Sequence, residues 1–202
     1  MKTDELMRLA PVIPVLVLEE ERDWTALGET FVAAGLPVLE VTLRTPVATD
    51  AIRAMSRVPG AVVGAGTVLN EVQLAEALDA GSQFIVSPGL TNPLALAARD
   101  TEVAFLPGVA TAGDIMRGLD LGLDRFKFFP AESSGGIQAL KALSGPFGNV
   151  RFCPTGGIRP ETAADWLAEP AVLCVGGTWF VKSGDGFDAI GERARAAAAL
   201  AR

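Results

Sequence analysis

The sequence VLEVTLRT, residues 38–45, predicts a β-strand with two unlike faces. Successive side chains of a strand point to opposite sides. The odd positions here are apolar, while the even positions carry an acid, a hydroxyl and a base: Glu40, Thr42 and Arg44. A strand enclosed on both sides normally buries apolar groups on both faces. We therefore interpret the polar face as part of a functional site. The alternative is a buried structural ion pair, which seldom stabilises a protein outright.

This strand belongs to a pattern that repeats along the chain. Short apolar, β-rich runs recur roughly every 20–25 residues, the length of one β–α unit. They lie at 12–18, 37–43, 61–66, 83–87, 103–107, 125–129, 150–154 and 172–175. Eight strands alternating with helices predict a parallel sheet closed into a (β/α)8 TIM barrel. An open doubly wound sheet is the alternative, but its dinucleotide fingerprint is incomplete after Gly64-Ala65-Gly66. We expect a single domain over residues 1–202 with a short leading helix at 3–10.

Local signals mark where several of the helices begin and end. Asn70 is predicted to cap the start of one helix, and Gly81 to close it. Pro46 and Pro160 are predicted to lie in the first turns of two others, since proline is well tolerated there. The alanine-rich tail, residues 187–202, is predicted to be helical.

Composition narrows the chemistry that the chain can carry out. The net charge of −7 argues against binding to nucleic acids or to membranes through a basic surface. The chain has no histidine, which excludes Ser-His-Asp and Cys-His catalysis and every histidine-ligated metal site. Acid–base chemistry must therefore use carboxylates, lysine, hydroxyls or water.

The N-terminus and the cysteines predict a cytoplasmic protein. The apolar run at 12–18 stops at three glutamates, too short to cross a membrane, and we expect no secretory signal. Cys153 and Cys174 lie in apolar, strand-like runs, so we expect buried, reduced thiols. A disulfide between them is the alternative.

The segment RFKFFPAE, residues 125–132, places a lysine inside the predicted barrel. Phe126 and Phe128 should face the helices, so Lys127 between them faces the interior. None of the other three lysines lies in the middle of a predicted strand. An amine must be neutral to attack a carbonyl, and burial favours the neutral form. Lys127 is thus a candidate nucleophile. The alternative is a lysine that pairs with Glu40 only for structure.

Two glycine pairs follow the last two predicted strands. Gly156-Gly157 and Gly176-Gly177 lie at corresponding points of consecutive β–α units, and Thr178 follows the second pair. Barrels commonly bind phosphate there, through backbone N–H groups that glycine leaves open. Either pair alone would more often be a tight turn, but the two together predict phosphate binding. Thr67, after another glycine-rich strand end, is either a hydroxyl offered to the cavity or an ordinary threonine before a helix.

Six segments together resemble one enzyme family, in register over essentially the whole chain. They are VLEVTLRT (38–45), VGAGTVLN (63–70), SPGLT (87–91), FKFFPAE (126–132), RFCPTGGI (151–158) and LCVGGTW (173–179). This pattern is similar to that of the 2-keto-3-deoxy-6-phosphogluconate (KDPG) aldolases, which are often also 4-hydroxy-2-oxoglutarate (KHG) aldolases. The resemblance implies a class I, metal-free, cofactor-free barrel enzyme, usually a homotrimer.

The resemblance also implies a role for each matching residue. Lys127 would be the Schiff-base nucleophile and Glu40 the general acid/base. The substrate-binding residues would fall into three groups: Arg44 and Thr67 for the keto-acid carboxylate, Pro88 and Phe129 for the pyruvate pocket, and Gly156, Gly157, Gly177 and Thr178 for the phosphate. Thr178 departs from the pattern, which has serine there; its hydroxyl is kept, but the extra methyl group could alter the fit.

The expected reaction is cleavage of KDPG to pyruvate and glyceraldehyde 3-phosphate. Three alternatives remain open from the sequence. The main substrate could be the unphosphorylated 4-hydroxy-2-oxoglutarate. The chain could be another phosphate-binding barrel lyase or isomerase in which Lys127 acts only as a charge. It could also be a non-catalytic phosphometabolite-binding protein, although such a protein has no use for an interior lysine beside an interior glutamate.

Overall fold

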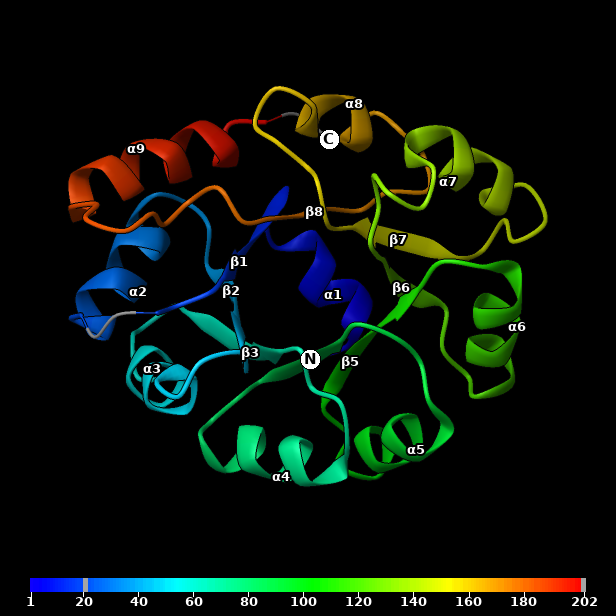
Figure 1. The fold of residues 1–202 in the computed structure, drawn as a ribbon, viewed down its shortest axis with the longest axis horizontal. Coiled ribbons are helices and arrows are strands. Elements are labelled where there is room, and N and C mark those ends of the chain that lie inside the picture. The colour runs from blue at the N-terminus through cyan, green and yellow to red at the C-terminus, as the bar shows by residue number, and fades with distance from the viewer. Residues whose placement is uncertain (20–21, 201–202) are drawn as a thin grey trace.

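A computed structural model describes residues 1–19 and 22–200, and it has eight parallel strands in a ring (Figure 1). The strand order is β7-β6-β5-β4-β3-β2-β1-β8. Single bridges, Phe152 to Val172 and Thr155 to Gly176, join the two ends of this sheet and close the ring. The predicted (β/α)8 barrel is therefore confirmed. The strands are β1 Val12–Leu16, β2 Val38–Thr42, β3 Val62–Gly66, β4 Phe84–Ser87, β5 Ala104–Val109, β6 Arg125–Phe128, β7 Arg151–Pro154 and β8 Val175–Gly177.

Helices form an outer ring around the strands (Figure 1). They are α2 Trp24–Ala33, α3 Ala48–Met55, α4 Glu71–Asp79, α5 Asn92–Asp100, α6 Ala112–Asp120, α7 Gly136–Ser144, α8 Ala163–Leu167 and α9 Phe187–Ala198, while the first helix, α1 Thr3–Arg8, lies across one end of the ring. Asn70 caps α4 as predicted, since its side chain accepts a hydrogen bond from the Gln73 amide at 2.9 Å. The predicted tail helix ends at Ala198, and its last two residues, 201 and 202, lie outside the described part of the chain. Within the described part, no helix is both long and apolar enough to cross a membrane.

Two helix starts and one strand were predicted at the wrong place. Helices α3 and α8 begin two or three residues after Pro46 and Pro160, because a turn precedes each helix. In the second case the Arg159 carbonyl accepts hydrogen bonds from the amides of both residues that follow Glu161. The last strand is Val175–Gly177 rather than 172–175, so Gly177 lies within β8 instead of after it.

Packing separates an outer core from the barrel interior. Leu39 and Val41 of β2 belong to the cluster between strands and helices, whereas Val38 belongs to the interior cluster. The alternation predicted for this strand is therefore confirmed. Cys153 and Cys174 lie buried in the interior cluster and are not joined in a disulfide, which confirms that prediction too.

Helix α1 closes the interior at the amino-terminal ends of the strands. It lies across the middle of the ring in Figure 1. Leu6 and Met7 are completely buried and pack against the apolar interior cluster. Thr3 donates a hydrogen bond to the carbonyl of Phe105 at 3.2 Å. An ion pair of 2.6 Å between Asp4 Oδ1 and Arg125 Nε fixes the helix to β6. The lower end of the barrel is therefore filled, and only the carboxyl ends of the strands can open to a ligand.

Candidate active site

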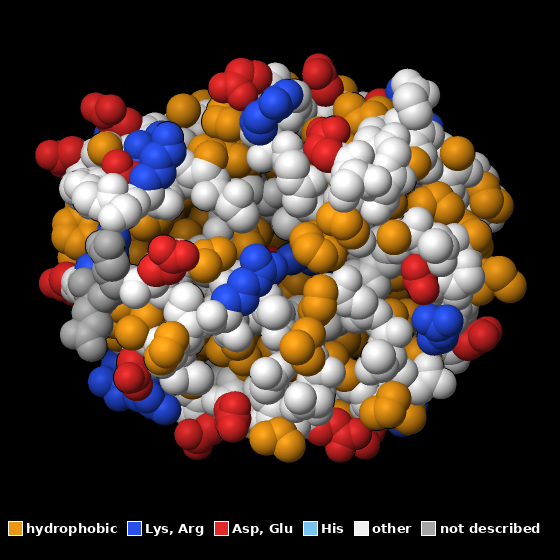
Figure 2. Space-filling view, viewed as in Figure 1, with side chains coloured by type: hydrophobic (Ala, Val, Ile, Leu, Met, Phe, Trp, Pro, Cys, Tyr) orange, Lys and Arg blue, Asp and Glu red, His pale blue; other side chains and the backbone are white. Residues whose placement is uncertain are grey.

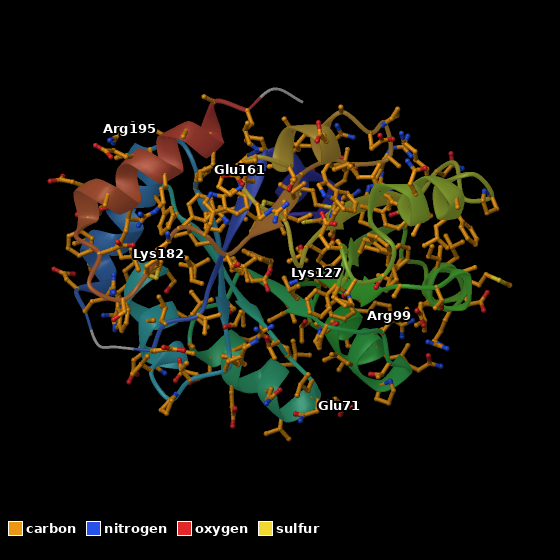
Figure 3. All side chains as sticks on the ribbon, turned by 45° about the horizontal axis from the view of Figure 1, so that its top comes forward. Glu71, Arg99, Lys127, Glu161, Lys182 and Arg195 are labelled. Carbon is orange, nitrogen blue, oxygen red and sulfur yellow. The ribbon has the colours of Figure 1, made fainter. Side chains whose placement is uncertain are left out.

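Lys127 and Glu40 meet inside the barrel as a buried ion pair. Lys127 Nζ lies 2.9 Å from Oε1 and 3.2 Å from Oε2 of Glu40. The two residues are only 5% and 3% exposed. Strands β6 and β2 are separated by three strands on either side of the closed ring, so the pair crosses the barrel. Figure 3 shows Lys127 within the ring of strands.

The sequence pattern placed these two side chains correctly. Phe126 and Phe128 are fully buried in the outer core, so the residue between them faces inward. Removing two charges from water costs several kcal/mol per ion, and only good geometry offsets that cost. In this contact, the Glu40 carboxylate, which can accept a proton, lies directly against the Lys127 amine. The arrangement therefore suits an amine that has to lose a proton before it reacts.

Gly66 of β3 makes the room that Glu40 occupies, and Gly64 makes room for Phe84; neither role was predicted from the sequence. A Cβ on Gly66 would lie 2.2 Å from Glu40 Oε1, and one on Gly64 would lie 2.5 Å from the ring of Phe84. Both glycines face the interior, and Gly66 pairs with Thr42 on the strand that carries Glu40. The signal was present as glycine at alternate positions of a strand, which indicates close approach of another group.

Arg44 and Thr67 meet at the upper rim, just beyond β2 and β3. Arg44 Nε donates a hydrogen bond to Thr67 Oγ1 at 3.0 Å. Thr67 has φ of 61°, which is unusual for a β-branched residue and indicates that its surroundings impose this conformation. A guanidinium beside a hydroxyl can bind a carboxylate. Figure 2 shows Lys and Arg side chains at the middle of one face of the molecule.

Phe129 lies near the amine just after β6, and Pro88, just after β4, packs onto the neighbouring strand β5. Lys127 Nζ is 5.4 Å from the centre of the Phe129 ring. Gly108 pairs with Lys127, and a Cβ on Gly108 would lie 2.1 Å from the Pro88 carbonyl oxygen. The turn at Pro88 therefore packs directly onto the strand beside the lysine. Both residues are half-buried.

The ends of β7 and β8 bring the two glycine pairs close together. Gly156 and Gly157 follow β7 with φ of 99° and 84°, conformations that L-residues rarely adopt. The bridge from Thr155 to Gly176 places β8 directly beside this loop. A Cβ on Gly176 would lie 2.3 Å from Thr155 Oγ1, so β8 can approach β7 only with glycine there. Gly177 is the last residue of β8, and Thr178 after it is exposed.

The structure thus groups all ten predicted site residues at one end of the barrel, in and above the ring of strands. Their individual roles stay predictions. Among residues 1–19 and 22–200, no group of three or more carboxylate or thiol side chains is placed to hold a metal ion. The expectation of metal-free chemistry likewise stays a prediction.

Comparison with known proteins decides the family. The family described as KDPG and KHG aldolase matches residues 3–192. The chain belongs to this family. A 2-dehydro-3-deoxy-phosphogluconate aldolase from Zymomonas mobilis is 60% identical over 181 residues, which are 90% of this chain and 87% of that protein. The resemblance inferred from the motifs is confirmed, and with it the prediction of a carbon–carbon lyase that acts through a Schiff base.

Two solved structures of KDPG aldolases are similar over nearly their full length. The Zymomonas mobilis enzyme, crystallised with 3-phosphoglycerate, superposes with a TM-score of 0.96 at 56% identity, covering 99% of this chain and 96% of that one. The Legionella pneumophila enzyme, with pyruvate captured as a covalent carbinolamine intermediate, gives a TM-score of 0.94 at 41% identity, covering 98% and 99%. This chain therefore agrees with these KDPG aldolases in family, fold and size.

Proposed function

We propose that this KDPG and KHG aldolase family member cleaves KDPG to pyruvate and glyceraldehyde 3-phosphate, with Lys127 as the nucleophile. The observation that carries the proposal is the contact between a buried amine and both oxygens of a buried carboxylate in the barrel. Lys127 is also the residue that corresponds to the Schiff-base lysine of the family motif. The Legionella pneumophila relative, which holds pyruvate covalently, supports the same chemistry.

The reaction follows from these two side chains. The neutral amine of Lys127 adds to the C2 ketone, and loss of water gives an iminium. Glu40 then takes the proton of the C4 hydroxyl, the C3–C4 bond breaks, and its electrons flow into the iminium to form an enamine. Glyceraldehyde 3-phosphate leaves. Protonation of the enamine at C3 and addition of water to the resulting iminium release pyruvate and restore the amine.

The rim residues would hold the pyruvate half of the substrate. Arg44 and Thr67 offer a cation and a hydroxyl to the C1 carboxylate, while Pro88 and Phe129 would line the pyruvate pocket and keep out all water except the molecule that hydrolyses the iminium. Water exclusion matters because it strengthens the electrostatic interactions within the site.

The loops after β7 and β8 would hold the phosphate. Backbone N–H groups of Gly156, Gly157 and Gly177, with the Thr178 hydroxyl, form a phosphate site of the kind that barrels have at this position. The phosphorylated compound bound to the Zymomonas mobilis relative supports this assignment. KHG cleavage is a second activity that the family description favours, since Lys127 and Glu40 would act on the shared keto-acid part.

We further propose a homotrimer in the cytoplasm. Large apolar side chains are exposed on and beside α4, α5 and α6: Leu69, Val72, Leu96, Met116 and Leu119. Contact with other subunits would cover such residues. Reduced, buried cysteines support a reducing compartment.

Trapping with pyruvate and borohydride tests the proposed function. Reduction of an iminium fixes pyruvate to the protein, and peptide mapping locates it. We expect one adduct, on the peptide that contains Lys127. Absence of an adduct, or an adduct on another lysine, would refute the mechanism and favour a barrel in which Lys127 acts only as a charge.

A further inference from the structure

Glu132 contacts the glycine loop after β7, and neither the family motif roles nor the proposed mechanism uses it. Its Cβ and Cγ occupy the space directly beside Gly157: a Cβ on that glycine would lie 2.6 and 2.5 Å from them. Its amide donates a hydrogen bond to the Gly156 carbonyl at 3.0 Å. Glu132 therefore holds the loop through both its main chain and its side chain.

The carboxylate of Glu132 is anchored in turn to the core. Trp166 Nε1 donates a hydrogen bond to Glu132 Oε1 at 3.2 Å. Trp166 is 1% exposed, and its ring packs against Phe128, with centroids 6.3 Å apart. A buried indole N–H needs an acceptor. The loop is thus connected through Glu132 and Trp166 to the residue that follows Lys127.

A carboxylate beside a phosphate loop carries an electrostatic cost, because it repels a dianion. Two successive glycines without such support would lose much conformational entropy when they close around a ligand. We propose that Glu132 is a positioning residue that fixes Gly156 and Gly157 in the phosphate-binding conformation and so sets the preference for phosphorylated substrate. This inference rests on the phosphate site of the proposed function.

The test compares two reactions in one protein sample. Condensation of pyruvate with glyceraldehyde 3-phosphate uses the loop, whereas condensation with unphosphorylated glyceraldehyde does not. For Glu132→Ala we expect KM for the phosphorylated aldehyde to rise about five- to tenfold, the size of the net contribution of one typical hydrogen bond. kcat and the rate with glyceraldehyde should change less than twofold. Glu132→Gln keeps the acceptor and the carbon chain, and it should retain most of the preference.

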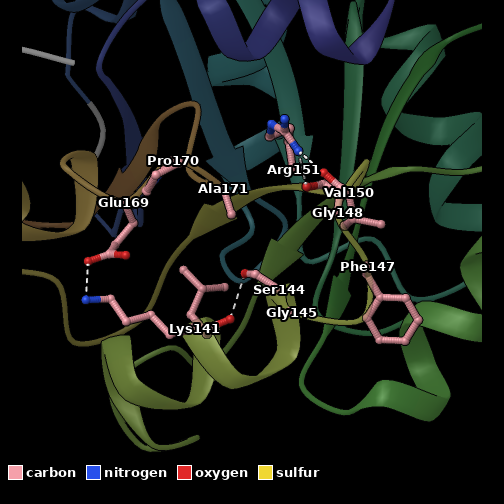
Figure 4. Close-up of a pocket in the computed structure, with 11 residues that line it drawn as sticks. Lys141, Ser144, Gly145, Phe147, Gly148, Val150, Arg151, Glu169, Pro170 and Ala171 are labelled. Carbon is pink, nitrogen blue, oxygen red and sulfur yellow. Dashed lines mark hydrogen bonds and ion pairs between the residues drawn. The ribbon is translucent and has the colours of Figure 1, made fainter.

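Glu169→Gln is the matched control. This carboxylate pairs with Lys141 at 2.8 Å beside a cavity of about 350 Å³ between α7 and the connection from α8 to β8 (Figure 4). Like Glu132, Glu169 links two neighbouring elements of the fold. It lies near the amino-terminal end of β7, away from the glycine loop. We expect no change in substrate preference. Trp166→Phe removes the N–H donor together with part of the buried ring, and it should shift the preference in the same direction as Glu132→Ala, which gives a second measurement if the alanine variant does not fold.

The outcomes separate this inference from the proposed function. If wild-type protein shows no preference for the phosphorylated aldehyde, the proposed phosphate site is wrong. If wild type has the preference and both Glu132→Ala and Trp166→Phe keep it, the positioning role is wrong. An equal rise in KM for both aldehydes, or an equal shift in Glu169→Gln, also overturns it, because either result indicates general structural damage.

Discussion

The two ends of the barrel interior differ sharply although the same strands build both. At the amino-terminal end, Leu6 and Met7 of α1, which have no exposed surface themselves, seal a buried apolar cluster. At the carboxyl end, glycines replace side chains, and Lys127 and Glu40 occupy part of the freed space. The comparison teaches that the lower layers stabilise the ring, while the upper layers can carry charged groups that contribute little to stability.

Lys127→Met should have the largest effect, because it removes activity at the carboxyl end of the barrel and leaves the amino-terminal end intact. Removing the nucleophile should lower turnover by at least about a thousandfold. The circular dichroism spectrum should be that of wild type, because the lower layers still hold the ring. Turnover above about a tenth of wild type would show that Lys127 is not the nucleophile.

Glu40→Gln should slow turnover by about a hundred- to ten-thousandfold, the range for loss of a general acid/base. The amide cannot take the C4 hydroxyl proton, but the lysine is still present. Trapping with pyruvate and borohydride should therefore still label Lys127, more slowly. An unchanged steady-state rate would exclude Glu40 from proton transfer.

Gly66→Ala should damage the upper end without removing any reactive group. The added methyl group would lie 2.2 Å from Glu40 Oε1, so the carboxylate must move. We expect kcat to fall about a hundredfold, as for a displacement of about 1 Å of a catalytic group. Gly148→Ala, where a Cβ meets nothing within 4 Å, is the control and should keep normal kcat.

Leu6→Ala, at the amino-terminal end of the barrel, should lower stability and leave activity nearly unchanged. Truncating a fully buried leucine should lower the free energy of unfolding by about 2–4 kcal/mol. The rate per folded molecule should stay within about twofold of wild type, since α1 does not reach the upper rim. Urea denaturation and activity at low temperature check the two parts. A large loss of kcat in the folded variant would show that the ends are coupled.

Asp4→Asn should have the smallest effect. Hydrogen bonds from Arg8 and Arg125 hold the pKa of Asp4 below its ordinary value. Because the pKa of Asp4 is lower in the folded protein than in the unfolded chain, its ion pairs stabilise the fold fully at pH values above the unfolded pKa of about 3.9. This stabilisation is lost as the pH falls through the folded pKa. Because Asp4 is partly exposed, we expect about 0.5 kcal/mol at pH 7. The difference from wild type, measured by urea denaturation, should shrink below about pH 4. A constant difference down to pH 2 would contradict the assignment.

The sequence predicted the ring and its charged pair because both follow from strand alternation. Phe126 and Phe128 had to face the helices, which left one orientation for Lys127. The sequence did not predict the position of β8. Gly176 lies in that strand because only glycine lets it approach Thr155, its neighbour across the closing bridge. The role of Gly66 was not predicted for the same reason. A side chain there would collide with Glu40 of the adjacent strand, and this contact is known only once the strands are paired.

The Lys127–Glu40 contact spans strands on opposite sides of the ring, 87 residues apart in the chain. Acid and amine are therefore neighbours only when every intervening strand is in place. In a nascent chain that has not yet paired these strands, the lysine amine lies in water. Such a chain would not capture cellular ketones, and the covalent chemistry is confined to molecules that have completed folding.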